Sequence, residues 1–349
     1  MYRLARWLGL ALVAPTLAAQ APDSTAPVHK AARLFRSNEP VVMWLQADFK
    51  QVFRDRDSMS TKRYPATLKY LGESGDTIAF DVQLGTRGHL RLRQCDFVPL
   101  KVYFDKEKTK GTVFGGEGAL KLTPHCTRSD RDAQDIYVEY AIYQMYNELT
   151  PISLKARLAN ITWMDPANPK FTLTRPAFWT QDEDDLAKEL RGKVLMQRGG
   201  NASEMDPTQM AITDVFQYMI ANTDFSLSYL HNYRIFQTDT STSWYPMAYD
   251  FDWSGLVDAP YAKPSDVLHL APSARVTDRL YRGGCHPPEV LAQAVAPFKA
   301  KKDTLYGVLR SIKELTPARL KQATGFLDEF YKELNDPGTY TKVFRRTCP

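Results

Sequence analysis

The stretch that most constrains the fold is residues 206–256, where a capped helix runs into two aromatic strands. Asp206, Pro207 and Gln209 form a helix-start pattern in which an acid caps the first turn and a glutamine completes a capping box. The residues that follow at helical spacing predict one buried face: Ile212, Val215, Phe216, Met219 and Ile220. The helix is expected to end at Asn222-Thr223-Asp224.

Two strands are predicted next, over 231–236 and 244–251, because both runs are rich in aromatic and branched residues. The polar segment 237–243 between them is typical of a hairpin loop. The second strand carries Asp250 and Asp252 among Tyr, Phe and Trp. Burying an acid is costly unless something pairs with it, and hard cations such as Mg²⁺ take oxygen ligands. We therefore expect a metal ion near Asp250.

The order Asn222-x-Asp224, His231-Asn232 and Asp250-Phe251-Asp252 resembles the CotH (spore-coat protein H) family of secreted, atypical protein kinases. The resemblance implies an ATP-dependent kinase with Mg²⁺ or Mn²⁺, in which Asp224 is catalytic. It implies that Asp250 holds the metal that bridges ATP phosphates, with Asn232 and Asp252 as further ligands. The sequence contains no HRD, DFG or Walker A motif, so ordinary kinases and P-loop enzymes are not indicated.

The resemblance also extends to an Arg-Gly turn and a lysine-bearing strand upstream. Arg87, in the turn 84–88, is a candidate phosphate contact, although an ordinary hairpin explains the turn equally well. Lys101 is the first candidate for a lysine on the ATP phosphates, and Lys121 is the second. Glu139 lies on the helix predicted over 133–149; it either pairs with one of these lysines or, as we favour, is an exposed residue. Gln181 stands where the family often has Glu.

The N-terminus predicts export. Residues 1–20 combine Arg3 and Arg6 with a short apolar run and small residues, which is typical of a cleaved signal peptide. The run is shorter than the roughly 20 residues that span a bilayer, and no other segment is long and apolar enough, so we expect no transmembrane segment in the mature chain. Cleavage would lower the formal charge from +5 to +3, which does not indicate a nucleic-acid partner.

Strand patterns dominate the first half of the chain, over 41–45, 64–70, 77–84, 99–104, 154–164 and 171–180, and helical patterns dominate 288–330. We therefore divide the chain into a flexible lead-in (21–40), a mostly antiparallel N-lobe with one helix (41–190) and a C-lobe with the catalytic and metal site (191–349). The predicted fold class is α+β, a two-lobed, kinase-like fold with a sheet-rich N-lobe and a helix-rich C-lobe.

Four cysteines in an exported chain predict two disulfides. Three pairings are possible, and we favour Cys95–Cys126 and Cys285–Cys348 because each pair lies within one half of the chain. No pair has the spacing of a zinc site.

The predicted function is transfer of phosphate from ATP to a hydroxyl of a secreted or surface protein, by a secreted or periplasmic enzyme. Three alternatives remain open: an inactive pseudokinase, a hydrolase that uses two carboxylates roughly 5–9.5 Å apart, and a structural surface protein whose acids bind Ca²⁺.

Overall fold

The computed structural model describes residues 31–345 and Cys348 of the 349-residue chain. The predicted signal peptide lies outside the described residues. None of the helices that the structure describes has the length and hydrophobicity needed to cross a bilayer.

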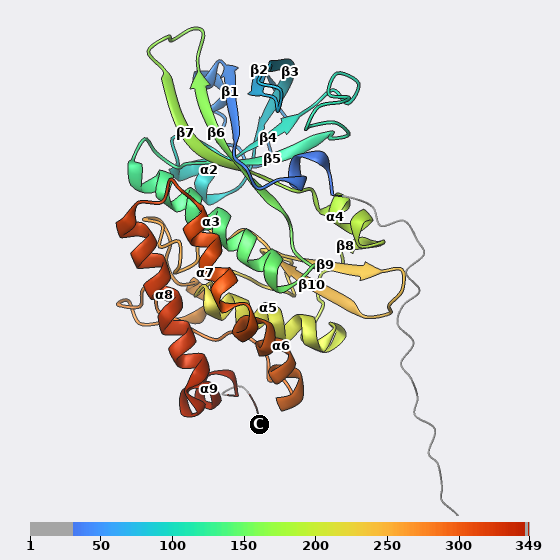
Figure 1. Ribbon diagram of the computed structural model, residues 1–349, viewed down its shortest axis with the longest axis vertical. Coiled ribbons are helices and arrows are strands. Elements are labelled where there is room, and N and C mark those ends of the chain that lie inside the picture. The colour runs from blue at the N-terminus through green and yellow to red at the C-terminus, as the bar shows by residue number, and fades with distance from the viewer. Residues whose placement is uncertain (1–30, 346–347, 349) are drawn as a thin grey trace, which may run out of the picture.

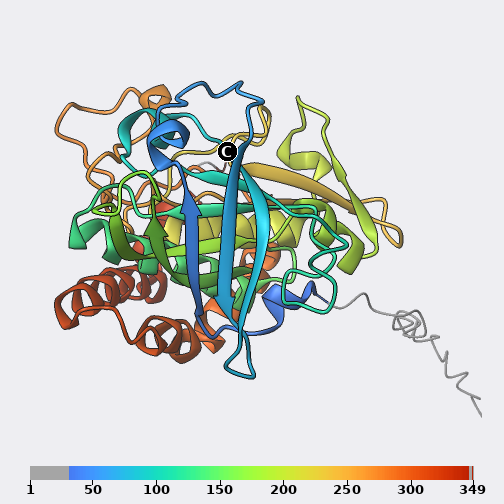
Figure 2. The same ribbon diagram turned by 90° about the horizontal axis from the view of Figure 1, so that it is seen from above.

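Seven of the described strands form a closed barrel in the order β1-β2-β3-β4-β5-β7-β6 (Figure 1). Neighbours pair antiparallel, except that β1 and β6 pair in parallel and so close the barrel. Figure 2 shows the blue strands β1 to β3 side by side from above. The strands are β1 (Val41–Ala47), β2 (Tyr64–Leu71), β3 (Thr77–Thr86), β4 (Leu100–Tyr103), β5 (Ala119–Pro124), β6 (Ala156–Met164) and β7 (Thr172–Thr180).

The closed barrel shows that the predicted two-lobed, kinase-like fold is wrong. That prediction required an open, mostly antiparallel sheet as a separate lobe. Instead, Val41 to Gln46 of β1 pair in parallel with Ala159 to Met164 of β6, and this pairing covers the two edges that an open sheet would expose. The strands themselves lie close to their predicted positions, so the error concerns how they pair.

Aromatic side chains fill the barrel. β1 alternates buried and more exposed positions, as a strand with one face on a core must. The large side chains that meet in this core include Phe49, Phe97, Phe114, Trp163 and Trp179, all of them almost completely buried. The barrel is therefore a packed core and not a pore.

The remaining elements form a second core. Helix α3 crosses the middle of the molecule between the barrel and the other long helices (Figure 1). The segment after the barrel also forms a three-stranded sheet in the order β10-β9-β8. The helices are α1 (Phe49–Val52), α2 (Leu90–Gln94), α3 (Asp130–Leu149), α4 (Glu183–Glu189), α5 (Pro207–Met219), α6 (Pro288–Ala300), α7 (Lys302–Ser311), α8 (Pro317–Asn335) and α9 (Pro337–Phe344), with short 3-10 turns at Arg33–Arg36, Ala202–Glu204 and Asp266–Leu268; the small sheet comprises β8 (Gly192–Leu195), β9 (Tyr233–Thr238) and β10 (Trp244–Ala248).

Both favoured disulfides are confirmed: Cys95 is bonded to Cys126 and Cys285 to Cys348. The first joins the end of α2 to the segment after β5, and the second joins a loop before α6 to the end of the chain. Such bonds are typical of proteins that fold in oxidising compartments.

Candidate functional site

The predicted central helix is confirmed as α5, and its end places the first acid. Asp206 caps the helix by accepting a hydrogen bond from the Gln209 backbone N–H, and Pro207 stands in the first turn. Ala221 adopts a left-handed backbone conformation (φ 51°) directly after the helix, which turns the chain sharply. Asn222 Oδ1 then accepts a hydrogen bond from the Asp224 backbone N–H at 2.9 Å. This turn fixes the backbone of Asp224 shortly after the end of α5.

Asp224 is held by the two residues that the sequence grouped with it. Asn232 Nδ2 donates to Asp224 Oδ2 at 3.0 Å and to the Asp224 carbonyl at 2.7 Å. His231 Nε2 lies 3.0 Å from Asp224 Oδ1. This hydrogen bond to Asp224 is the main reason that the pKa of His231 is raised. The amide of Asn232 faces Asp224 with its nitrogen, so its oxygen is the atom left to ligate a cation.

The second predicted strand ends earlier than expected, and this changes how Asp250 is presented. β10 stops at Ala248, so Asp250 and Asp252 follow the strand and do not lie on it. Asp250 has a left-handed backbone (φ 63°), which is uncommon outside glycine and points to a constrained position. Its backbone N–H donates to the Tyr143 hydroxyl at 3.0 Å, which anchors the turn to α3.

The two acids after β10 have different surroundings. Asp252 is buried and accepts a hydrogen bond from the Tyr261 hydroxyl at 2.9 Å. Burial, followed by the charge of Asp250, raises the pKa of Asp252 to about 7. Among the described residues, no Lys, Arg or His forms an ion pair with Asp250. Asp252 likewise forms no ion pair in the described part of the chain, so both acids after β10 lack a cationic partner there.

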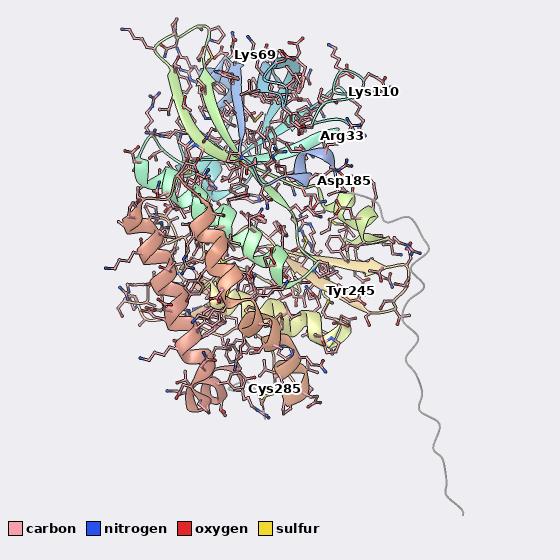
Figure 3. The ribbon with its side chains drawn as sticks, viewed as in Figure 1. Arg33, Lys69, Lys110, Asp185, Tyr245 and Cys285 are labelled. Carbon is pink, nitrogen blue, oxygen red and sulfur yellow. A yellow bond between two sulfur atoms is a disulfide. The ribbon has the colours of Figure 1, made fainter. Side chains whose placement is uncertain are left out.

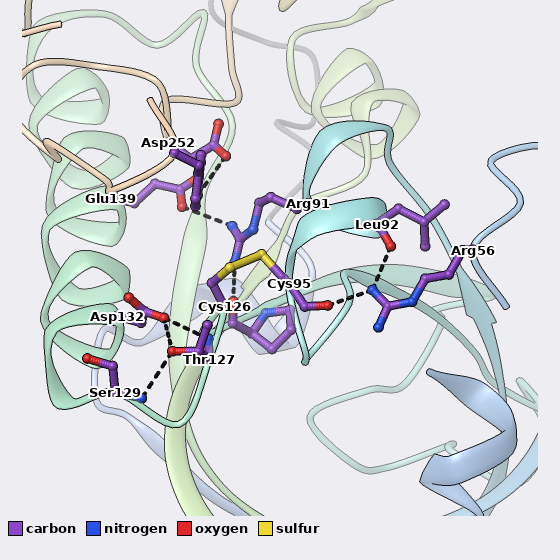
Figure 4. The surroundings of a disulfide bond; sticks show 12 residues. Arg56, Arg91, Leu92, Cys95, Cys126, Thr127, Ser129, Asp132, Glu139 and Asp252 are labelled. Atoms are coloured by element: carbon purple, nitrogen blue, oxygen red, sulfur yellow. Dashed lines mark hydrogen bonds and ion pairs between the residues drawn. A yellow bond between two sulfur atoms is a disulfide. The ribbon is translucent and has the colours of Figure 1, made fainter. Parts of the chain in front are cut away.

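Glu139 is not the exposed helix residue that we favoured, nor does it pair with Lys101 or Lys121. It is 2% exposed and forms an ion pair with Arg91 at 3.5 Å. Figure 4 shows Arg91 reaching from α2 towards Glu139, with Asp252 beside that acid. Arg91 also donates a hydrogen bond to the Pro124 carbonyl. The sequence pattern did not indicate this burial because nearly every position of α3 after Arg131 is buried or half-buried, whatever its residue type.

Of the two candidate lysines, Lys121 has the more organised surroundings. Lys101 and Lys121 are directly paired across β4 and β5, so they lie on the same face of the sheet. Lys101 Nζ lies 5.6 Å from the Tyr103 ring centroid. Lys121 forms an ion pair with Glu183 at 2.7 Å, and burial, opposed by Glu183 and assisted by the Arg87 charge, lowers the pKa of Lys121.

Three cations, Arg87, Lys121 and Arg234, lie close enough for their charges to interact, and we call them the cation group. The Arg87 and Arg234 charges both act on Lys121. Tyr249 connects this group to the acids: its ring centroid lies 4.7 Å from Arg234 Cζ and 5.8 Å from Lys121 Nζ. Tyr249 immediately precedes Asp250, so Lys121 and Arg234 contact the residue next to that acid.

Gln181 lies in the interior of the protein, where hydrogen bonds hold its side chain. It is fully buried, its Oε1 accepts from the Lys155 backbone N–H at 3.1 Å, and its Nε2 donates to Glu189 at 2.5 Å. The acid nearest to Lys121 is Glu183, two residues later. Glu183 also lies 3.3 Å from Arg234 Nε, so it joins two members of the cation group.

Sequence reasoning missed Arg91, Glu183, Arg234 and Tyr261. Glu183 belongs to an acidic run that is typical of a solvated helix start, and Arg234 lies on a strand between apolar neighbours. Neither pattern indicates a partner. Among these four residues, Arg91 alone has a sequence feature that restricts its position. It lies four residues before Cys95, and the disulfide at Cys95 limits where its helix can lie.

The side chains after β10 include oxygen donors of the chemical type that divalent ions take. Within the described residues, no group of three or more His, Cys, Asp or Glu side chains forms a ready metal cage. Asp250, Asp252 and the Asn232 oxygen supply two carboxylates and one amide oxygen. Mg²⁺ commonly binds proteins through one or two carboxylates together with waters and substrate phosphates. Asn232 and Asp250 both have left-handed backbones (φ 54° and 63°). This uncommon backbone conformation fixes the direction in which each oxygen-bearing side chain leaves the chain.

A scan of the sequence against protein-family models found no match, and a search of curated proteins also found none.

Proposed function

We propose that this chain is an exported phosphotransferase that moves the terminal phosphate of ATP to a hydroxyl group of a secreted or surface protein. The observation that carries the proposal is that Lys121 and Arg234 lie over the ring of Tyr249, the residue directly before Asp250, while the charges of Asp224 and Asp250 both act on Asp252. Phosphoryl transfer needs positioning and charge neutralisation more than covalent chemistry, and this arrangement offers both signs of charge at one place. The resemblance of 222–252 to CotH kinases supports the same reaction.

The proposed reaction does not depend on a kinase-like fold. Sites of one chemistry recur on unrelated folds, so the closed barrel bears on ancestry more than on activity. The export component rests on the N-terminal sequence pattern and on the two disulfides.

Each part of the site has a distinct role in this proposal. A divalent ion, when bound, would neutralise charge on the phosphates, and Asp250, Asp252 and Asn232 would hold it. Lys121 and Arg87 would contact phosphate oxygens, with Glu183, which also pairs with Arg234, orienting Lys121. Asp224 would accept a hydrogen bond from the acceptor hydroxyl and take its proton as the new P–O bond forms and the bond to ADP breaks. Asn232 fixes Asp224 Oδ2, and His231 lies beside Oδ1.

A second candidate is a protein that binds metal and nucleotide without transferring phosphate. The observation in its favour is that both carboxylate oxygens of Asp224 already lie at hydrogen-bond distance from neighbouring side chains. In addition, Lys121 already pairs with Glu183. An acceptor hydroxyl and a phosphate would both have to compete with these contacts.

Thermal melting tests the proposal. We expect ATP and Mg²⁺ or Mn²⁺ together to raise the melting temperature of the oxidised protein, because a ligand that binds only the folded state stabilises it by mass action. Asp250→Asn should lose the joint effect while remaining folded. Asp266→Asn is a matched control, since Asp266 is an exposed acid that pairs with Lys263. If ATP and metal leave the wild-type midpoint unchanged, the proposal is wrong.

A further inference from the structure

The segment 281–286, which we call the strap, passes beside the proposed catalytic turn although it is nearly 60 residues away in sequence. Arg282 extends from it and donates hydrogen bonds through Nη1 to two backbone carbonyls, those of Thr223 and Phe225, the second at 3.0 Å. These carbonyls lie on either side of Asp224. The Arg282 guanidinium also lies over the Phe225 ring, 4.8 Å from its centroid. A single side chain thus holds the backbone before and after Asp224.

The strap is fastened to the body of the protein at three points. The Gly284 backbone N–H donates to Asp214 Oδ2 at 3.0 Å, and His286 Nε2 lies 2.8 Å from the same oxygen. Asp214 is 1% exposed and belongs to α5, the helix that leads into the catalytic turn. The third fastening is the Cys285–Cys348 disulfide. Figure 3 places Cys285 at the end of the molecule opposite Lys69 of the barrel.

The strap is also closely packed. A Cβ on Gly283 would lie 2.6 Å from the Asp214 Cβ, closer than real Cβ atoms approach other atoms. The backbone there can therefore shift little towards α5. Because both the strap and the catalytic turn are fixed to α5, Arg282 spans two parts of the chain whose separation is constrained.

We propose that Arg282 is a positioning residue that fixes the Asp224 turn, and that the strap holds Arg282 through Asp214 and the Cys285–Cys348 disulfide. The role assigned to Asp224 rests on the proposed phosphotransferase function, whereas the fastening of the turn does not. Arg282 donates hydrogen bonds to backbone carbonyls on both sides of Asp224. Removing its side chain should therefore increase the backbone motion of residues 222–232.

Arg279 provides a matched control. It lies three residues earlier, donates a hydrogen bond to the Phe326 carbonyl and stacks on the Phe326 ring with 3.9 Å from Cζ to the centroid. It therefore makes the same kinds of contact as Arg282 but towards α8, where it also pairs with Glu329 at 3.3 Å. Arg279→Gln removes a buried arginine of similar chemistry without touching the Asp224 turn.

The first arm of the test is amide hydrogen exchange of the full, oxidised chain, compared for wild type, Arg282→Gln and Arg279→Gln. Losing two hydrogen bonds from a charged donor should speed exchange in 222–232 by about 10- to 100-fold in Arg282→Gln. Arg279→Gln should leave that segment unchanged and affect α8 instead. Unchanged exchange in 222–232, or equal changes there in both variants, would overturn the inference.

The second arm measures phosphate transfer from radiolabelled ATP with Mn²⁺, using casein as a hydroxyl-bearing probe. Arg282→Gln should lower kcat about 10- to 100-fold with little change in KM for ATP, and Arg282→Lys should restore part of the loss. A change in KM with unchanged kcat would mean that Arg282 binds nucleotide, which contradicts a positioning role. If wild type transfers no phosphate and ATP with metal does not shift its melting, the proposed function fails, and the exchange arm still decides whether Arg282 fixes the turn.

Discussion

Replacing His125 with phenylalanine should remove a loss of folding stability that the barrel core suffers at low pH. His125 is fully buried directly after β5, with its ring centroid 4.1 Å from that of Phe97 and 6.1 Å from that of Trp163. Neither ring nitrogen has a hydrogen-bond partner among the described residues. The imidazole is therefore confined to an aromatic site that does not favour its charged form.

The magnitude follows from the pKa of His125. Burial, together with the nearby Arg175 charge, lowers it from 6.5 to about 3. Below pH 6.5 the unfolded chain takes up a proton that the folded chain refuses, so stability is lost as the pH falls towards 3. One pKa unit corresponds to about 1.4 kcal/mol, so this residue should cost the wild type about 2 kcal/mol at pH 5 relative to pH 7.5.

The assay is urea unfolding of wild type and His125→Phe at pH 7.5, 6.5, 5.5 and 5.0. Phenylalanine is larger than histidine, and overpacking would shift the variant by a constant of about 1 kcal/mol or more. The diagnostic quantity is therefore how the difference in unfolding free energy changes with pH. It should grow in favour of the variant by about 1.4 kcal/mol per unit well below pH 6.5. A difference that stays constant across the range would refute the reasoning.

The remaining predictions concern the disulfide near α2, the strap and the proposed catalytic acid. The double variant Cys95→Ser, Cys126→Ser opens a cross-link that spans 31 residues, so the chain-entropy relation predicts a loss of about 4 kcal/mol in the free energy of unfolding, measurable in urea. A loss below about 1 kcal/mol would contradict this prediction. Gly283→Ala places a Cβ against the Tyr281 ring, so we expect it to lower stability by about 1–3 kcal/mol; an unchanged melting temperature would show that the strap can move. Asp224→Asn should keep the melting shift produced by ATP and metal but lose phosphate transfer by about 100-fold or more; retained transfer would exclude Asp224 as the base.

How far the site could be predicted from the sequence depends on which residues are considered. The resemblance of one local segment named both Asp224 and Asn232, as a catalytic acid and a metal ligand, and the structure places Asn232 Nδ2 3.0 Å from Asp224 Oδ2. Glu139 was misjudged, since its partner Arg91 lies 48 positions earlier and only the folded chain brings the two together. The positions of Lys121 and Glu183, 62 residues apart, were likewise set by tertiary contacts.

The sequence by itself determined the local structure: the cap and length of α5, the positions of most strands and the presence of two disulfides. Helix caps, strand alternation and turn residues act within a few positions, so a pattern is enough to indicate them. Only the tertiary structure decided that β1 joins β6 to close a barrel, and that β10 ends before Asp250. Strand pairing across more than 100 residues depends on the energy of the whole assembled core, which no local pattern contains.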